Sequence, residues 1–241
     1  MPSYRKSARL TSILEHAQTL GASLAGVARI ASLREAPSYQ QYAPRAFPEE
    51  MNSVLVLALR HEEDEPELDW WGPQVQGGTP GNQRLREMAE ALAQWLQRTY
   101  AIQAQPLAYY VDTVGELLQE KGGTFLKDAA VLAGLGVMGD NNLLITPEFG
   151  PRVRLRALFL DHAFEPPDPL TFSPCDACDH PCQAACPQQA FVFGTYSREL
   201  CARQMHIDEA NSVMIPSAST GTPQQRITYC RACEFACPVG R

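Results

Sequence analysis

Residues 175–187 read CDACDHPCQAACP and residues 230–238 read CRACEFACP, and with Cys201 these two runs hold all eight cysteines of the chain. Each run ends in the pattern Cys-x3-Cys-Pro. Short Cys-x2-Cys and Cys-x3-Cys spacings wrap the backbone tightly enough to bring several soft thiolate ligands to one inorganic core. We therefore expect the cysteines to organise the C-terminal part of the chain around metal.

These endings are typical of bacterial two-cluster ferredoxins, in which the last cysteine of one run ligates the other cluster. The same crossover predicts two [4Fe–4S] clusters that use every cysteine once. The first ligand set is Cys175, Cys178, Cys182 and Cys237. The second ligand set is Cys186, Cys201, Cys230 and Cys233. Because Cys237 lies close to the end of the chain, removal of residues 237–241 is expected to damage a cluster.

Zinc sites and disulfides are the alternatives. Paired Cys-x2-Cys motifs can hold two zinc ions with four cysteines each, although zinc ribbons have no use for two Cys-x3-Cys-Pro endings. Four disulfides would suit a secreted chain, but no cysteine precedes Cys175. The start of the chain, MPSYRKSARLTSILEH, also lacks the apolar stretch of a secretion signal. Iron–sulfur clusters are favoured over both.

The composition bounds the class of protein. A formal charge of −7 argues against a general nucleic-acid surface, and 45% hydrophobic residues allow a sizeable core. No run approaches the roughly 20 apolar residues of a membrane span. We expect a cytoplasmic protein with no membrane partner, in a reducing compartment that suits oxygen-sensitive clusters.

Apolar periodicity predicts helices and strands before the cysteines. Leu10, Ile13, Leu14 and Ala17 recur at helical spacing, and residues 85–99 give the clearest helix. Apolar runs predict strands at 24–30, 52–59, 105–111, 143–146 and 153–161, with a helix at 124–133 between them. The mixture predicts an α+β or α/β fold, with a layered α/β domain over residues 1–161 and a small cysteine-bearing domain over residues 162–241.

Two features of the first domain are candidates for a site. Asp112 falls where a strand gives way to a loop, a place where such folds commonly put reactive groups, although an Asp there also caps turns. In AGLGVMGDNNLLI (133–145), Gly134, Gly136 and Gly139 allow positive φ angles and close approach of the backbone to a ligand. A helix and not a strand precedes these glycines, so they do not match a dinucleotide site.

A further candidate is the segment HEEDEPELDWWGPQVQGGTPGN at 61–82, which predicts a long loop. Trp70 and Trp71 would be costly to leave in water. They either form the wall of a pocket under a lid or pin the loop to the core.

The order YVDT (110–113), AGLGVMGDNNLLITPEFG (133–150), an apolar strand and the two cysteine runs resembles epoxyqueuosine reductase. That family reduces an epoxide on a tRNA-borne base with cobalamin and two [4Fe–4S] clusters, and the cysteine part is also similar to corrinoid-dependent reductive dehalogenases. The resemblance implies a nitroreductase-like, corrinoid-binding first domain, a ferredoxin-like second domain, and Asp112 as proton donor. The implied corrinoid-lining residues are Gly134, Gly136, Gly139, Asn141 and Asn142.

The chain departs from the family pattern in ways that bear on the substrate. Three residues separate Cys178 from Cys182 where the family usually has two, and Asp140 replaces a lysine. The given sequence stops soon after Cys237, without the helical-repeat domain that holds tRNA in the family. These departures predict a short paralogue for which tRNA is a doubtful substrate.

Three functions follow from this sequence. The first is an oxidoreductase that passes electrons through the two clusters to a small-molecule substrate or a cofactor, with cobalamin as the candidate, in the first domain. The second is an electron-transfer protein or corrinoid reductase that docks a redox partner protein and steers it with the acidic residues 62–69. The third is a zinc-stabilised interaction module.

Overall fold

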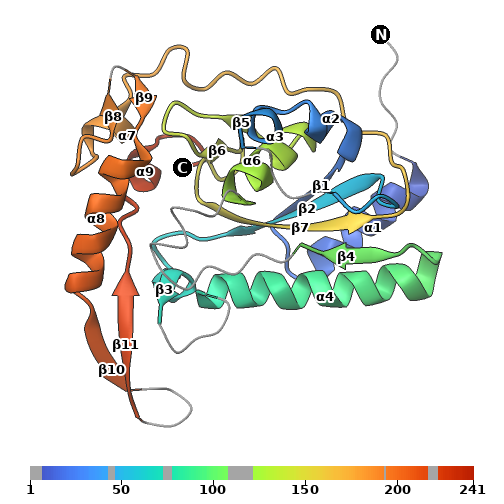
Figure 1. Ribbon diagram of the computed structural model, residues 1–241, viewed down its shortest axis with the longest axis horizontal. Helices are drawn as coiled ribbons and strands as arrows, with labels where there is room; N and C mark the ends of the chain where they lie inside the picture. The colour runs from blue at the N-terminus through green and yellow to red at the C-terminus, as the bar shows by residue number, and fades with distance from the viewer. Residues whose placement is uncertain (1–6, 43–46, 73–77, 108–121, 193, 217–221) are drawn as a thin grey trace.

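The computed structural model describes residues 7–42, 47–72, 78–107, 122–192, 194–216 and 222–241. A sheet with helices on both faces comes first in the chain, and the cysteine-bearing segment packs at one end of it (Figure 1). All strand pairs in these ranges are antiparallel. The expected mixed fold class is therefore confirmed, and of its two forms α+β applies.

The main sheet has the strand order β1-β2-β7-β4. Its strands are β1 (Leu24–Arg29), β2 (Ser53–Arg60), β7 (Val153–Leu160) and β4 (Ala104–Pro106). β2 lies inside the sheet and is buried along almost its whole length, because helices cover both of its faces. The continuous apolar run of β2 follows from this burial on both faces, because a strand exposed on one face would alternate apolar and polar residues.

Side chains of β2 divide between two hydrophobic layers. Leu55, Leu57 and Leu59 pack with α1 (Ala8–Thr19) and α4 (Pro80–Tyr100) on one face. Val54 and Val56 point to the other face, as the period of two requires, and pack with α2 (Ile30–Arg34) and α6 (Gly122–Leu132). α3 (Pro37–Tyr42) lies beside α6 on that second face (Figure 1). The result is a three-layer domain.

Local sequence explains where α1 and α4 begin. The side chains of Ser7 and Thr79 accept hydrogen bonds from the amides of Leu10 and Asn82, each at 3.2 Å. These are N-caps, which satisfy amides that have no partner inside the helix. Pro80 then supplies a fixed φ in the first turn of α4.

The segment predicted as a long loop at 61–82 contains regular structure among its described residues. A short 3-10 helix, η1 (Pro66–Asp69), leads into strand β3 (Trp70–Trp71). β3 pairs with β11 (Pro223–Thr228) of the cysteine segment, with Trp71 opposite Ile227. The tryptophans thus fasten this segment to the C-terminal part of the chain, a pairing that local sequence does not encode.

The cysteine segment follows residues 161–174, which run along the molecule without helix or strand (Figure 1). Its helices are α7 (Pro181–Ala184), α8 (Arg198–Ala210) and α9 (Ala232–Ala236). Its strands are β8 (Phe191–Val192), β9 (Thr195–Tyr196), β10 (Val213–Pro216) and β11. The division of the chain at residue 161 stays a prediction. Across the described ranges, no helix combines the length and apolarity that a membrane crossing needs.

Candidate functional site

Four thiols from the two ends of the cysteine segment lie near enough to influence one another's pKa. Burial raises the pKa of the Cys175 thiol, and charge on Cys178 and Cys237 raises it further. Burial also raises the pKa of Cys182, and its other charged neighbours are Cys237, Cys175 and Cys178. Cys237 comes from the end of α9, and α9 packs beside α7, which carries Cys182. These are the four residues predicted as the first ligand set.

The other four thiols form a second group. Burial raises the pKa of Cys233 to about 12. The negative charge of Glu234 is the next cause, followed by charge on Cys201, Cys230 and Cys186. The pKa of Cys230 is raised by burial, and Cys201 and Cys186 again appear among its charged neighbours. This is the membership predicted for the second ligand set.

The chemistry of both groups fits a cationic core. Four partly buried thiolates repel one another, and metal binding relieves that repulsion while it deprotonates the thiols. Backbone amides also point at the sulfurs: Ala190 donates to Cys186 Sγ at 3.3 Å, and the amide of Asp140 donates to Cys175. Amide donors of this kind tune iron–sulfur clusters. Within the described ranges, no three His, Cys, Asp or Glu residues converge closely enough to hold a single metal ion.

The glycine segment forms a hairpin beside the first thiol group. β5 (Val137–Met138) pairs with β6 (Leu144–Ile145). A Cβ atom on Gly136 or Gly139 would lie under 3.0 Å from atoms of Ile145, and Gly134 has φ +72°. The packing of the hairpin itself therefore requires these glycines, whereas their predicted part in lining a corrinoid stays a prediction.

Asn141 and Asn142 shape the turn of this hairpin. Asn141 is buried, and its Oδ1 accepts from the amide of Leu143 at 3.2 Å. Asn142 has φ +59°, a left-handed conformation that Asn tolerates, and its carbonyl accepts from Lys127 Nζ at 2.6 Å. Both residues thus have a structural role. Asp112, the predicted proton donor, lies outside the described residues.

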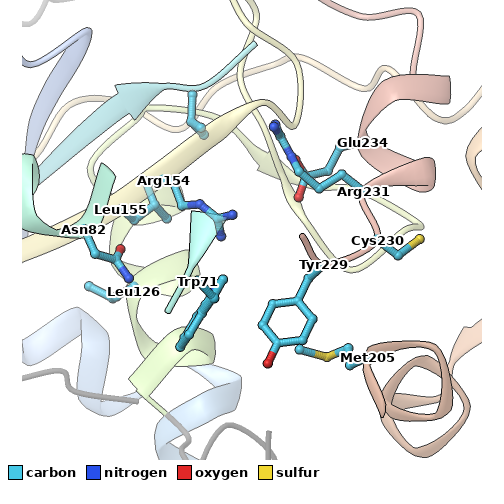
Figure 2. Close-up of a pocket in the computed structure, with 11 residues that line it drawn as sticks. Trp71, Asn82, Leu126, Arg154, Leu155, Met205, Tyr229, Cys230, Arg231 and Glu234 are labelled. Atoms are coloured by element: carbon cyan, nitrogen blue, oxygen red, sulfur yellow. The ribbon is translucent and has the colours of Figure 1, made fainter. Parts of the chain in front are cut away.

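A cavity of about 260 Å³ lies between the first domain and the cysteine segment (Figure 2). Trp71 and Tyr229 pack edge to face across it, with ring centroids 5.4 Å apart. Cys230 of the second thiol group reaches its wall. Trp71 therefore belongs to a pocket wall, one of the two predicted roles for the tryptophan pair. The residues lining the cavity are Trp71, Asn82, Leu126, Val153, Arg154, Leu155, Met205, Tyr229, Cys230, Arg231 and Glu234.

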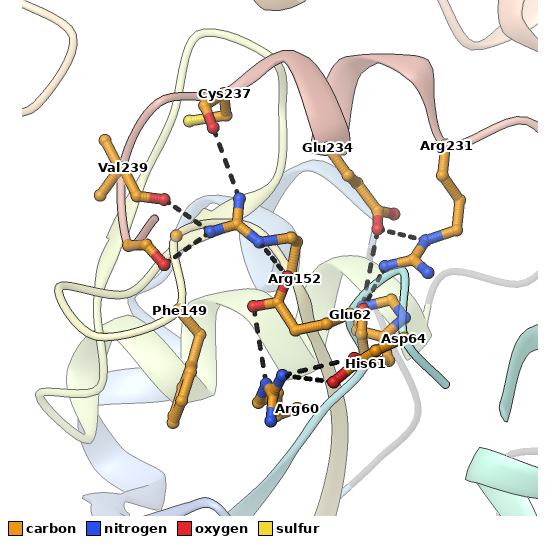
Figure 3. Close-up of polar contacts among 12 residues, drawn as sticks. Arg60, His61, Glu62, Asp64, Phe149, Arg152, Arg231, Glu234, Cys237 and Val239 are labelled. Carbon is orange, nitrogen blue, oxygen red and sulfur yellow. Dashed lines mark hydrogen bonds and ion pairs between the residues drawn. The ribbon is translucent and has the colours of Figure 1, made fainter. Parts of the chain in front are cut away.

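A buried carboxylate joins the two parts of the chain behind this cavity. Asp69 accepts from His61 Nδ1 at 2.8 Å, from Arg154 Nε at 2.7 Å and from Arg231 Nη1 at 2.5 Å. Arg231 lies between Cys230 and Cys233, and its Nε donates to Glu234 at 2.7 Å (Figure 3). Asp69 therefore couples a strand of the sheet to a cysteine loop.

Burial and charge set the protonation of this group. Burial alone would raise the pKa of Asp69, but the hydrogen bond from His61 and the charges of Arg154 and Arg231 outweigh it and hold the pKa well below its usual range. Burial and the nearby Arg154 lower the pKa of His61. Near neutral pH the group thus consists of a neutral imidazole, one carboxylate and two guanidinium ions.

Sequence reasoning missed Asp69, Arg154 and Arg231. Asp69 is the last acid of a run whose composition is typical of a solvated loop. It is buried because η1 turns its side chain inward. The one local signal was an arginine inside a Cys-x2-Cys motif of an otherwise acidic segment.

No family model matches the chain. The chain is 32% identical over 158 residues to tetrachloroethene reductive dehalogenase of Desulfitobacterium hafniense, which covers 64% of this chain and 25% of that protein. It is 31% identical over 124 residues to epoxyqueuosine reductase of Listeria monocytogenes, with coverage of 48% and 30%. The chain thus spans about a quarter to a third of these two relatives.

Solved structures share the fold. The epoxyqueuosine reductase of Bacillus subtilis superposes with a TM-score of 0.61 at 19% identity, over 96% of this chain and 65% of that one. A catabolic reductive dehalogenase in complex with 3-bromo-4-hydroxybenzoic acid gives 0.65 at 17% identity, over 98% and 32%. The fold is therefore that of the class shared by these reductases and dehalogenases. In sequence, the chain is similar to both epoxyqueuosine reductases and tetrachloroethene reductive dehalogenases.

Proposed function

We propose that this chain is an iron–sulfur redox protein, an oxidoreductase that passes electrons through two [4Fe–4S] clusters to an acceptor at the cavity beside Trp71 and Tyr229. The observation that supports the proposal is that the eight thiols influence one another's pKa within two sets of four, each with members from both cysteine runs. The names of the relatives, reductases and reductive dehalogenases, support a redox function.

Each thiol group has a defined task in this proposal. When bound, the clusters would supply one-electron transfer. The second group reaches the cavity through Cys230, so it is the exit toward the acceptor. The first group lies beside the glycine hairpin and is the entry from a redox partner protein.

The residues of the cavity would bind and orient the acceptor. Trp71 and Tyr229 present flat apolar surfaces for a planar molecule. Arg154 and Arg231 line the cavity with fixed orientations, because both donate to Asp69. Burial, followed by the charge of Glu209, raises the pKa of Tyr229, so its hydroxyl keeps its proton at neutral pH. The acceptor class is thus a small planar molecule or a planar cofactor edge.

Cobalamin is the cofactor that the family resemblance suggests. The cavity of about 260 Å³ is below the size of drug-sized pockets, and a corrinoid is larger than such ligands, so only part of one would enter. Asp112 as proton donor, and the hairpin residues Gly134 to Asn142 as corrinoid lining, remain proposals. Neither a membrane surface nor tRNA is part of this proposal.

Anaerobic titration tests the proposal. Reduction of the purified protein is expected to take up about two electrons per chain, one for each cluster. Addition of cob(II)alamin to the reduced protein should then change its spectrum, whereas the Trp71→Ala variant should bind it more weakly. Normal electron uptake without a spectral change would remove cobalamin and leave the small-molecule acceptor. No electron uptake at all would overturn the proposal.

A second function is electron transfer to a docked protein. It is favoured by the exposed acidic side chains of Glu63, Asp64 and Glu67, which lie close in sequence to Asp69 and its ion pairs, the junction between the sheet and the cysteine segment. An exposed acidic patch accelerates encounter with a basic partner, and salt screens that effect. Electron transfer to a basic acceptor protein should therefore slow as ionic strength rises. A rate that does not depend on salt would exclude steering by this patch.

A further inference from the structure

Arg152, at the entry to β7, contacts the end of the chain and not its own domain alone. Although charged, it is only 1% exposed. Its guanidinium donates to the carbonyl oxygens of Val239 at 2.9 Å, Gly240 at 2.8 Å and Cys237 at 3.4 Å (Figure 3). Its Nε pairs with a carboxylate oxygen of Glu62 at 2.7 Å. One side chain therefore ties three of the last five residues to the sheet.

The chemistry of these contacts is specific to arginine. α9 ends at Ala236, so the carbonyl groups of Cys237, Val239 and Gly240 have no acceptor role within the helix and need donors from elsewhere when buried. A guanidinium presents five donors in a planar fork, which can hold several carbonyls in one arrangement, whereas a lysine ammonium is a point charge on a flexible stem. Glu62 balances the buried charge.

Backbone packing holds the same residues by an independent means. Gly150 has φ +56° and Gly240 has φ +73°. A Cβ atom on Gly240 would lie under 3.0 Å from backbone atoms of Phe149 and Gly150, and one on Gly150 would lie as close to the carbonyl of Val239. The two backbones thus touch, and neither position has room for a side chain.

We infer that Arg152 is the positioning residue for Cys237, the thiol that the end of the chain contributes to the first group. Arg152 and the Gly150–Gly240 contact hold Cys237 beside Cys175 and Cys182 before any metal binds. The role of Cys237 as a cluster ligand depends on the proposed function. The claim that Arg152 fixes the position of Cys237 depends only on the contacts described above.

The test uses two variants with matched controls. Arg152→Lys keeps the charge but loses the fork, and Gly240→Ala creates the backbone clash at the end of the chain. Arg203→Lys alters an exposed arginine of α8. Gly194→Ala alters a glycine with φ +77° that has nothing within 4 Å of its Cβ position, so it carries backbone strain without a clash.

The first readout is metal content after anaerobic purification. Arg152→Lys and Gly240→Ala should lose one cluster, from about eight iron atoms per chain to about four, while the second thiol group keeps its spectroscopic signal. Both controls should keep about eight. Equal loss from both groups would indicate a general defect in folding and would overturn a specific role for Arg152.

The second readout needs no cluster. In metal-free protein, alkylation of Cys237 followed by mass spectrometry should be faster by at least about tenfold in both variants, because charge-assisted hydrogen bonds and close packing no longer protect it. The exposed thiol of Cys230 is the internal reference. Unchanged labelling of Cys237 in both variants would overturn the inference. Iron-free wild-type protein with protected Cys237 would refute the proposed function and leave the role of Arg152 standing.

If Arg152→Lys fails to fold, Gly240→Ala decides the question, since its change lies one residue from the chain end and outside the sheet.

Discussion

The sheet domain and the cysteine segment are stabilised by different means. Residues 8–160 bury two hydrophobic layers on either side of one sheet. Among the described residues of 175–241, the buried apolar side chains are few: Cys182, Ala190, Ala202, Ile227 and Cys237. Small segments with little core usually depend on metals or disulfides. The sheet therefore acts as the scaffold, and under the proposed function the cysteine segment would depend on its metal and on charged contacts with that scaffold.

Removal of metal should affect the two regions most unequally. A chelator under oxidising conditions should expose the α8 bonds after Arg198 and Arg203 to trypsin, with cleavage at least about 100-fold faster, because bound metal stabilises only the folded segment. Cleavage after Arg86 and Arg98 in α4 should change little. Equal acceleration at all four sites would contradict the division into a self-sufficient scaffold and a metal-dependent segment.

Asp69→Asn should weaken the junction between the regions more than any surface change. The substitution leaves the guanidinium groups of Arg154 and Arg231 without their shared carboxylate, and breaking a buried ion pair costs about 3–5 kcal/mol. Because Arg154 is 30% exposed, the lower end of that range applies. Urea unfolding followed by tryptophan fluorescence would report the loss.

Glu67→Gln is the matched control, since Glu67 is an exposed acid of the same short helix and should change stability by less than about 0.5 kcal/mol. Similar effects from both variants would mean that Asp69 does not hold the regions together.

Leu92→Ala addresses the scaffold alone. Leu92 is fully buried in α4 against the sheet, and truncation of such a leucine costs about 3 kcal/mol through lost burial and a cavity. Iron content per chain should stay that of the wild type under conditions where the variant is folded. Loss of iron from the folded variant, under conditions where the wild-type protein keeps its iron, would show that the scaffold and the cysteine segment are not separable in this way.

The smallest effect concerns His61 at the junction. Burial, followed by the charge of Arg154, lowers its pKa, so below pH 6.5 the unfolded chain takes up a proton that the folded protein refuses. The free energy of unfolding should therefore decrease as the pH is lowered from 6.5 toward the pKa of His61 in the folded protein. The decrease is at most about 1.4 kcal/mol per pH unit.

His61→Asn should flatten this slope between pH 7 and 5.5, measured as free energy of unfolding in urea, while His206→Asn at an exposed position should not. Asp69 stays ionised over this range, because its own pKa is held well below it. An unchanged slope in His61→Asn would place the acid sensitivity elsewhere.

Local patterns in the sequence predicted the scaffold well. β2 is a buried apolar run, β7 ends in one, and α4 has a clear helical period, so composition and spacing are sufficient for them. The antiparallel order β1-β2-β7-β4 could not be predicted, because pairing depends on contacts between distant segments. The crossover spacing of the two cysteine runs predicts two ligand sets, and the assignment of each thiol to a cluster stays a prediction.

The junction escaped sequence analysis for the same physical reason. Asp69 looks like one acid of a solvated run, and Arg152 carries no motif, yet both are buried by partners more than eighty residues away. Gly136 and Gly139 were predicted to allow positive φ angles beside a ligand, but neither has a positive φ, and the room that each provides is taken by Ile145.

Iron and acid-labile sulfide analysis of the anaerobically purified chain tests the central claim most directly. The two thiol groups predict about eight iron and eight sulfide per chain, with about half lost in Cys182→Ser and the other half lost in Cys233→Ser. About two zinc ions per chain without sulfide, or full iron content in both variants, would contradict the claim that these eight cysteines hold two clusters.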